Sequence, residues 1–437
     1  MSSRLRIVVT GLIAQHPELG GVTWDYVQYP LGLARLGHDV YYFEDSGQWP
    51  YTTDGGPSGT EWTANDPTNN VRHLADVMAR FGLADRWAYR FPVKPQWFGL
   101  SPRQRRAVLE SADLLINVSG TLHRPADYRR VKRLVYIDSD PVFTQIGLVL
   151  PRGQRKPRRR ILAHDVHFSF GEAFSSAIPE TGLRWRPTRQ PIVLSEWGHA
   201  TPPRDVFTTV MSWTSYRPLR YRGQQFGQKD MELRRFLELP KLVSPTPLEI
   251  ALNGIIGPKH AFWEMLAPGS PPPEIAGGRP RSTAGDLLMG MGWRVAEAAQ
   301  VCRDLDSYRQ YVQSSKGEWS VAKNGYVRGQ AGWFSCRSAC YLAAGRPVVV
   351  QDTGFAPVLP VGEGILSFRT MEEAVAAIRE VEGDYARHAR AARALAEEYF
   401  DSNKVLTRLI EDALTAEPSG APSRPETASP RLVAAQE

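Results

Sequence analysis

The chain has 437 residues, 42% of them hydrophobic and 23% charged, and carries a formal net charge of +7. This mixture excludes an intrinsically disordered or fibrous protein, and the length predicts two domains. The positive charge favours an anionic partner only weakly, because an arginine-rich proteome accounts for it as well. Three cysteines exclude a disulfide scaffold and indicate a reducing compartment, the cytoplasm. The apolar run over 5–13 is too short to span a membrane and lacks a signal-peptide cleavage pattern.

Residues 4–45 predict the opening βαβ unit of a parallel sheet. A β-branched strand over 4–12 precedes a glycine-containing loop over 13–26, and an amphipathic helix over 25–40 carries Gly37 near its end. Further strands are expected over 39–45, 112–120, 133–140 and 166–172. Small or acidic residues end these later strands, as they do at the ligand-binding edge of open α/β sheets.

A proline-rich segment over 184–204 predicts a linker, after which a second α/β series begins. Strands are expected over 205–216, 247–254, 292–298 and 346–352. Helices are expected over 229–240 with Pro240 as its end, over 304–316 with an Asp or Ser cap, twice within 370–400, and over 402–416. The Pro- and Gly-rich residues 257–283 predict a loop.

The stretch GWFSCRSACYLAAGRPVVVQDTGF, over 332–355, predicts a helix followed by a buried strand. Gly345 before Arg-Pro ends the helix, which therefore begins near Ser335. Its first turn holds Arg337 and Ser338 beside unpaired N–H groups, and such a helix end binds phosphate. A capped helix with a solvated arginine explains the same pattern. Asp352, at the end of the strand, is suited to bind sugar hydroxyls or to form a simple turn.

The motif RSACYLAAGRPVVVQDTG resembles the donor-site segment of GT-B glycosyltransferases, specifically the bacterial group 1-like family. The opening βαβ segment resembles the first unit of the same fold. The resemblance implies two Rossmann-like α/β domains that face a central cleft. It assigns an acceptor domain to 1–190, a nucleotide-sugar donor domain to 191–395, a C-terminal helix packing back on the first domain to 396–415, and a disordered tail to 416–437.

The resemblance implies sugar transfer from a nucleotide diphosphate-sugar to a hydroxyl of a natural product, glycan or lipid, with no metal or other cofactor. It implies donor contacts from Gly21, Ser212, Trp213, Glu318, Lys323, Ser335, Arg337, Ser338, Asp352 and Thr353. The sequence departs from the family at Cys340, where a glutamate usually binds the donor ribose. A cysteine cannot replace that bidentate acceptor, and Glu318 is the expected substitute.

His16 is the expected catalytic base, because it follows the first strand and inverting members of the fold place a histidine in this region. An imidazole has an ordinary pKa of about 6.5, which suits proton transfer. Asp138 is the second catalytic candidate, while Asp25 and Asp140 are expected to contact the acceptor. Asp25 and Glu18 are also candidate bases, and a loop histidine without a catalytic role is the commoner explanation of a residue such as His16.

The basic run over 152–160 predicts a solvated loop that could attract an anionic acceptor or a membrane surface, so at most peripheral membrane contact is expected. Nucleic acid is excluded as a partner because no aromatic interleaving or binding motif accompanies the run. A small-molecule sugar acceptor is expected instead. Two alternatives on the same fold stay open, a sugar-nucleotide epimerase and a non-catalytic binding protein. A Rossmann oxidoreductase is disfavoured, since G-x-G-x-x-G is absent from the first loop.

Overall fold

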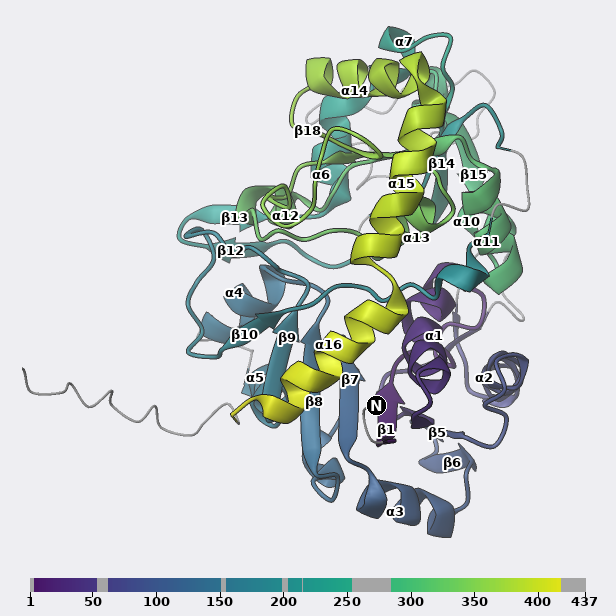
Figure 1. The fold of residues 1–437 in the computed structure, drawn as a ribbon, viewed down its shortest axis with the longest axis vertical. Helices are drawn as coiled ribbons and strands as arrows, with labels where there is room; N and C mark the ends of the chain where they lie inside the picture. Colours follow the sequence, from purple (N-terminus) through teal and green to yellow (C-terminus); the bar gives the residue numbers. More distant parts are fainter. Residues whose placement is uncertain are drawn as a thin grey trace, which may run out of the picture.

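The computed structural model describes residues 4–52, 62–150, 155–198, 203–213, 215–253 and 284–417. They form two α/β domains, each built on one large sheet, one in the lower half of Figure 1 and one in the upper half. The predicted loop over 257–283 lies outside the described residues, as does the predicted tail beyond residue 417. In the described part of the chain, no helix is both long and apolar enough to cross a membrane.

The first sheet has eight strands in the order β10-β9-β8-β7-β1-β2-β5-β6, all parallel except the β5–β6 pair. The strands are β1 (Arg6–Thr10), β2 (Asp39–Glu44), β5 (Trp87–Phe91), β6 (Gln96–Gly99), β7 (Leu114–Val118), β8 (Arg133–Asp138), β9 (Val166–Ser169) and β10 (Trp185–Pro187). The helices are α1 (Gly20–Arg35), α2 (Thr68–Arg80), α3 (Pro102–Ser111), α4 (Phe143–Val149) and α5 (Arg155–Leu162). The central strand β7 is buried along its length and apolar except for Asn117, because helices cover both faces of a parallel sheet.

The second sheet has six parallel strands in the order β15-β14-β11-β16-β17-β18. The strands are β11 (Phe207–Ser212), β14 (Leu248–Asn253), β15 (Arg294–Glu297), β16 (Gly317–Ser320), β17 (Val348–Gln351) and β18 (Ile365–Phe368). The helices are α6 (Lys229–Leu233), α7 (Leu239–Leu242), α9 (Ala284–Gly290), α10 (Ala298–Val301), α11 (Leu305–Ser314), α12 (Asn324–Gly329), α13 (Cys336–Ala343), α14 (Met371–Gly383) and α15 (Tyr385–Tyr399). Two antiparallel ribbons, β3 (Tyr51–Thr52) with β4 (Trp62–Thr63) and β12 (Leu219–Tyr221) with β13 (Gln224–Phe226), complete the strands.

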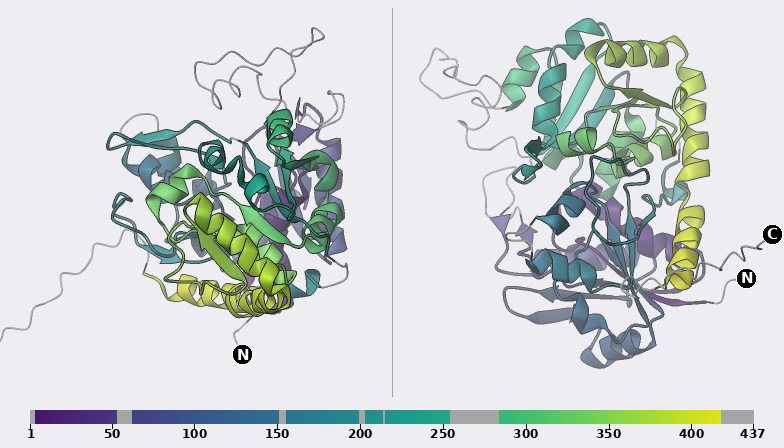
Figure 2. Two further views of the ribbon diagram at one scale, coloured as in Figure 1. Left: turned by 90° about the horizontal axis from the view of Figure 1, so that it is seen from above. Right: turned by 90° about the vertical axis from the view of Figure 1, so that its left-hand side faces the viewer.

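The final helix, α16 (Ser402–Thr415), returns to the first sheet. Figures 1 and 2 show α15 along the second domain and α16 continuing along the first. Leu406 packs so closely on α1 that a Cβ at Gly32 would lie 2.6 Å from its Cδ1 atom. Arg133 of β8 donates to the carbonyls of Ala413 and Ala416. The first sheet ends at Pro187 and the second begins with Phe207, and the predicted domain limits at 190 and 395 stay predictions.

Each predicted strand contains a strand of the structure, and the predicted helix over 304–316 is α11, capped by Asp304. Three other predictions were wrong. The helix over 229–240 is broken into α6 and α7, and Pro240 lies in the first turn of α7, where its missing N–H costs nothing. The linker over 184–204 contributes β10, which pairs with β9. The basic run is not only loop, because its part from Arg155 onward forms α5.

The start of α1 was also predicted wrongly, because the helix begins at Gly20, inside the expected loop. A Cβ at Gly20 would lie 2.0 Å from the carbonyl oxygen of Asp304, and one at Gly21 would lie 2.9 Å from Cε2 of Tyr308. The Gly20 N–H donates to the carbonyl of Cys302. The second domain therefore presses directly against the first turn of α1, and this contact requires glycine.

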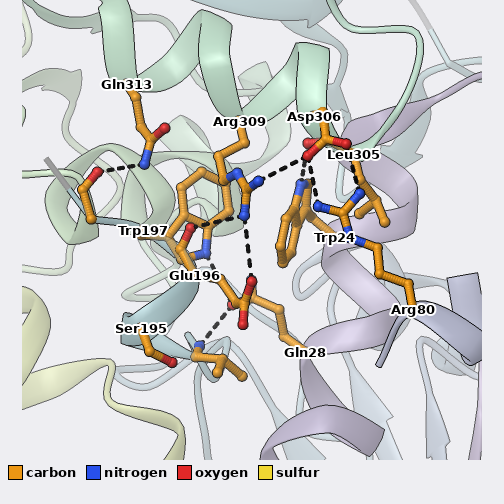
Figure 3. Close-up of polar contacts among 12 residues, drawn as sticks. Trp24, Gln28, Arg80, Ser195, Glu196, Trp197, Leu305, Asp306, Arg309 and Gln313 are labelled. Carbon is orange, nitrogen blue, oxygen red and sulfur yellow. Dashed lines mark hydrogen bonds and ion pairs between the residues drawn. The ribbon is translucent and has the colours of Figure 1, made fainter. Parts of the chain in front are cut away.

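Polar contacts behind this turn join the two domains (Figure 3). Arg80 of α2 makes two 2.7 Å hydrogen bonds to the Asp306 carboxylate of α11. The buried Trp24 donates from Nε1 to the Leu305 carbonyl at 2.8 Å and packs on Trp197 of the connecting segment. Helices α1 and α2 of the first domain thus both bind α11 of the second.

Replacing Gly20 with alanine should destabilise the protein, because the new methyl group meets backbone that cannot move aside. Overpacking of this kind costs about 1–3 kcal/mol. The matched control is Gly383→Ala at the end of α14, where a Cβ meets nothing within 4 Å. Urea unfolding should show a loss of stability for Gly20→Ala and none for the control. Equal stability of the two variants would contradict the close contact.

Candidate functional site

A cavity of about 790 Å³ lies between the two sheets at the carboxyl ends of their strands. Val118 and Asp140 reach it from the ends of β7 and β8, and Ser212 and Asn253 from the ends of β11 and β14. Open α/β sheets bind ligands at this edge. The volume is within the range of pockets that hold drug-sized ligands.

Two helix N-termini, one from each domain, open into this cavity. Gly21 and Val22 line it at the start of α1, and Ser335 and Cys336 line it at the start of α13. No side chain caps either helix, so the Ser335 hydroxyl is not used by its own helix. The first N–H groups of a helix have no acceptor within the helix, and they carry a partial positive charge. The cavity is therefore built to receive an anion.

Arg337 adds a fixed cation to the first turn of α13. Its Nε atom lies 2.5 Å from Oε1 of Glu318 on β16, and Nη1 donates to the Val210 carbonyl of β11 at 2.7 Å. The arginine side chain is 12% exposed and lines the cavity, whereas Glu318 is fully buried. The ion pair thus fixes the guanidinium in place. Its direction is determined by β16, which carries Glu318, and by β11, which carries the Val210 carbonyl.

Lys229, the first residue of α6, is a second cation in the cavity. Burial lowers the pKa of Lys229 well below its usual value, and the positive charges of Arg337 and Lys323 lower it further. Sequence reasoning missed this residue, although one signal was present. Acidic side chains are favoured in the first turn of a helix, so a lysine at the first position is unfavourable unless an anion compensates it.

Asp25 faces the same cavity from α1. Burial raises the pKa of Asp25 to about 7, while the positive charge of Arg337 opposes the rise. The group therefore changes its charge near neutral pH. A carboxyl group with these properties can accept a proton from a hydroxyl group at physiological pH.

Asp140 joins the domains at the rim of the cavity. Its Oδ1 atom accepts from Nζ of Lys323 at 3.0 Å and from the Tyr326 hydroxyl, and its Oδ2 atom accepts from the Tyr216 hydroxyl. The Lys323 ammonium also lies 4.7 Å from the ring centroid of Tyr216 and 5.4 Å from that of Phe143. We call Asp140, Tyr216, Lys323 and Tyr326 the rim cluster. Lys323, predicted to bind the donor, is held by this cluster at the cavity wall.

The two predicted catalytic residues do not line the cavity. Asp138 is buried, and its carboxylate accepts hydrogen bonds from Thr144, Gln145 and Ser169. Burial raises the pKa of Asp138 to about 6, and the Thr144 and Gln145 hydrogen bonds oppose the rise. These contacts fix the loop after β8, so the position of Asp138 favours a structural role.

His16 lies on the loop after β1, which Glu44 fixes by accepting from the N–H groups of Ala14 and Gln15. Its imidazole stacks on Tyr51 with 5.0 Å between ring centroids. This stacking directs the ring towards the β3 ribbon, and His16 is not among the residues that line the cavity. The catalytic role predicted for it has no support in this position.

Five residues predicted to bind the donor do not line this cavity: Trp213, Glu318, Ser338, Asp352 and Thr353. Ser338 and Thr353 line a small neighbouring cavity, which shares Ser335 and Arg337 with the large one. Trp213 belongs to the core of the second domain, and Glu318 is the partner of Arg337. Asp352 forms an ion pair with Arg369 at 2.6 Å, and Thr353 donates to the Trp333 carbonyl. Cys340, at the position of the usual glutamate, is buried and faces Gln28 of α1, with 4.0 Å between Sγ and Nε2.

The structure brings seven predicted residues together around the cavity: Gly21, Asp25, Asp140, Ser212, Lys323, Ser335 and Arg337. They come from both domains and from segments far apart in the sequence. Among the described residues there is no group of three or more His, Cys, Asp or Glu side chains that could hold a metal ion.

The fold is that of solved glycosyltransferases. An alpha-glucosyltransferase in complex with UDP-glucose and DNA containing an abasic site has a TM-score of 0.55 and 14% identity, covering 94% of this chain and 100% of that chain. HepE of Anabaena, in complex with UDP and glucose, has a TM-score of 0.52 and 12% identity over 94% of this chain and 100% of that chain. The chain has the GT-B fold. The predicted fold, two Rossmann-like domains that face a central cleft, is therefore confirmed.

At these identities the likeness concerns the fold. A comparison with protein-family models found no match, and a comparison with curated protein sequences found none. One expectation is corrected. The exclusion of nucleic acid was wrong, because alpha-glucosyltransferase structures that match this chain hold DNA. That exclusion relied on a missing sequence motif, but a folded surface binds DNA with residues that are scattered along the chain.

The buried ion pair predicts an unusual pattern of stability. Arg337→Ala should destabilise the protein by about 3–5 kcal/mol, because it leaves the Glu318 carboxylate buried without a partner. The double variant Arg337→Ala/Glu318→Gln should recover most of this loss, since the remaining side chain is neutral. Lys241→Ala, which breaks an exposed pair with Glu238, serves as the control and should cost about 0–1 kcal/mol. Urea unfolding measures all three, and an additive double variant would contradict the pairing.

Proposed function

We propose that the protein transfers a sugar from a nucleoside diphosphate-sugar to an acceptor hydroxyl. The observation that carries the proposal is the meeting of two helix N-termini, Arg337 and Lys229 in one cavity between two α/β domains. A diphosphate needs such a set of N–H donors and cations. Solved structures of the same fold hold UDP or UDP-glucose, which supports this ligand class.

In this proposal the diphosphate lies between the first turns of α1 and α13. Gly21 offers backbone N–H and close approach, and Ser212 and Ser335 offer hydroxyl groups beside it. Arg337 and Lys229 stabilise the negative charge that grows on the diphosphate as the bond to the sugar breaks. Fixed donors of this kind lower the barrier because they need no reorganisation during the reaction.

Asp25, across the cavity, contacts the acceptor hydroxyl and takes up its proton. It replaces His16 and Asp138 as the proposed base because it is the carboxyl group that both lines the cavity and titrates near pH 7. Asp140 of the rim cluster contacts the same acceptor. The closed interface between the domains keeps water from the donor, which limits its hydrolysis.

We also propose that the reaction needs no metal and takes place in the cytoplasm, where the three free cysteines stay reduced. Arg337, Lys229 and the helix termini supply the positive charge for which other enzymes use a divalent cation. A chelator such as EDTA should therefore leave nucleotide binding and turnover unchanged. Loss of turnover in EDTA, restored by added Mg²⁺ or Mn²⁺, would overturn this part of the proposal.

Lys229→Met should lower the affinity for the nucleoside diphosphate by about 1.5–3 kcal/mol, the worth of a charge-assisted hydrogen bond. A thermal-shift titration with UDP, dTDP and GDP identifies the nucleotide, because a ligand that binds only the folded protein raises Tm. Calorimetry then measures the affinity. Lys241→Met, at an exposed position of α7, is the matched control and should bind normally. Equal affinities of the two variants would contradict the role of Lys229.

Diphosphate binding should also take up protons. An anion bound beside Lys229 raises the lowered pKa of this lysine. At a pH between the pKa in the free protein and the pKa in the complex, binding therefore adds a proton to Lys229. The affinity should consequently fall as pH rises through this range. Calorimetry in buffers of different ionisation enthalpy reports the uptake, which should disappear in Lys229→Met. Proton-neutral binding in the unmodified protein would contradict the prediction.

Asp25→Asn should lower kcat by about 100-fold or more, the size of a general-base contribution, while nucleotide affinity stays unchanged. Because the pKa of Asp25 is about 7, turnover in the unmodified protein should rise with pH through 7 as the carboxyl ionises, and this rise should be absent in the variant. Asp286→Asn, away from the cavity, is the control. Product from nucleotide sugar alone would instead indicate an epimerase, and nucleotide binding without any turnover would indicate a binding protein.

A further inference from the structure

A second cavity, of about 270 Å³, lies beside the first on the side of α4 and α5. Its walls combine apolar and aromatic side chains with the polar side chains of Asp140, Thr144 and Arg158, and Arg158 donates to the Leu148 carbonyl at 2.9 Å. The apolar and aromatic residues include Tyr136 of β8, Phe143 and Leu148 of α4, Ile161 of α5 and Leu219 of β12. Both domains contribute, since β12 belongs to the second half of the chain. We call this the α4–α5 pocket.

The α4–α5 pocket adjoins the large cavity through the rim cluster. Asp140 and Tyr216 line both cavities, so the side chains of these two residues lie between the α4–α5 pocket and the large cavity. The polar oxygens of Asp140 lie at this junction, while the apolar walls lie beyond it. A ligand in the α4–α5 pocket would therefore present its polar end to Asp140 and to the large cavity.

Backbone strain marks the loop that forms this junction. Val142 has a φ of 73°, in the left-handed region that a β-branched residue rarely adopts. Such strain costs of order 1–3 kcal/mol and persists where the surrounding structure enforces it, often at ligand sites. Val142 is buried between Asp140, at the junction, and Phe143, in the pocket wall. The strained turn thus places one residue at each part of the site.

We propose that the α4–α5 pocket binds the acceptor, and that the acceptor is an aromatic compound of one or two fused rings that carries a hydroxyl group. This inference rests on the proposed function. The volume lies slightly below the roughly 300 Å³ at which pockets for drug-sized ligands begin, which suits a small ring system. Tyr136, Phe143 and Tyr216 provide aromatic edges and faces for it. The ring hydroxyl lies at the junction beside Asp140 and opens to the large cavity, where Asp25 is the proposed base.

The probe is 4-methylumbelliferone, a fluorescent two-ring phenol, titrated into the full chain without any nucleotide. The main variant is Gly147→Leu in α4, because Gly147 is a helical residue that lines the pocket. Leucine there removes pocket volume and favours the helix. Gly147→Ala is the matched control. Leu219→Trp fills the pocket from the opposite wall and keeps the test independent of α4.

Saturable binding to the unmodified protein and to Gly147→Ala is expected, with an affinity at least ten-fold weaker in Gly147→Leu and in Leu219→Trp. Thermal melting confirms that each variant is folded. The absence of probe binding to the unmodified protein overturns the inference. So does an affinity in both filled variants that equals that of the unmodified protein. A protein that binds a DNA duplex but not the phenol overturns it in favour of a nucleic-acid acceptor.

Nucleotide binding separates this inference from the proposed function. The thermal shift with the nucleoside diphosphate should be the same in Gly147→Leu as in the unmodified protein, since the filled pocket lies outside the large cavity. Probe binding that is weakened in both Gly147→Leu and Leu219→Trp supports the acceptor pocket, even where no nucleotide stabilises the protein. A nucleotide response without probe binding supports the donor site and overturns the acceptor pocket.

Discussion

The close contact between the first turn of α1 and the start of α11 determines how the two domains meet. The turn approaches the backbone of Asp304 so closely that only a glycine fits at Gly20. Trp24 and Arg80 then bind the neighbouring residues of α11, and the segment that connects the domains packs behind them. The first turn of α1 lines the cavity, while the Gly20 N–H donates to the Cys302 carbonyl. The start of α1 and the start of α13 thus line one cavity.

The second domain contributes a matching end through a buried ion pair. Arg337 and Glu318 lie 19 positions apart, yet α13 and β16 bring them to 2.5 Å. A buried carboxylate is costly without a partner, so Glu318 keeps the guanidinium in one position. The same low-dielectric site lowers the pKa of Lys229 and raises that of Asp25. Burial between the domains thus shifts both groups towards their neutral forms.

The rim cluster and the α4–α5 pocket extend the site away from the helix termini. In the rim cluster, Asp140 comes from the first domain and Tyr216, Lys323 and Tyr326 from the second. Contacts between the domains consequently exist on both sides of the large cavity, at α11 behind it and at Asp140 on the rim. Both cavities have mixed walls, because Lys229, Lys323 and Arg337 line the large one and Arg158 joins the aromatic side chains of the α4–α5 pocket.

Local patterns predicted most strands of the two large sheets, because apolar, β-branched runs indicate buried strands. They missed the short strands β5, β6, β10, β16 and β18. The prediction of one helix over 229–240 was wrong, because these residues form the two short helices α6 and α7. Tertiary contacts outweighed the helical period of the local sequence. The site was predicted in part. Arg337 and Ser335 follow from the helix-stop pattern at Gly345, whereas Lys229 required knowledge of which helix start faces the cavity. Asp138 has the residue type and strand-end position of a catalytic group, but its carboxylate accepts four hydrogen bonds that fix the loop after β8.

The sequence by itself determined two parallel α/β units and the start and end of α13. These features depend on neighbours a few residues apart, so the order of residues is sufficient to fix them. The tertiary structure alone decided that α1 and α13 share a cavity, that Glu318 supports Arg337 instead of a ligand, and that His16 stacks on Tyr51 away from the cleft. Each of these depends on the packing of two domains whose contacting residues are far apart in the chain, and that packing sets both the distances and the burial from which the chemistry of the site follows.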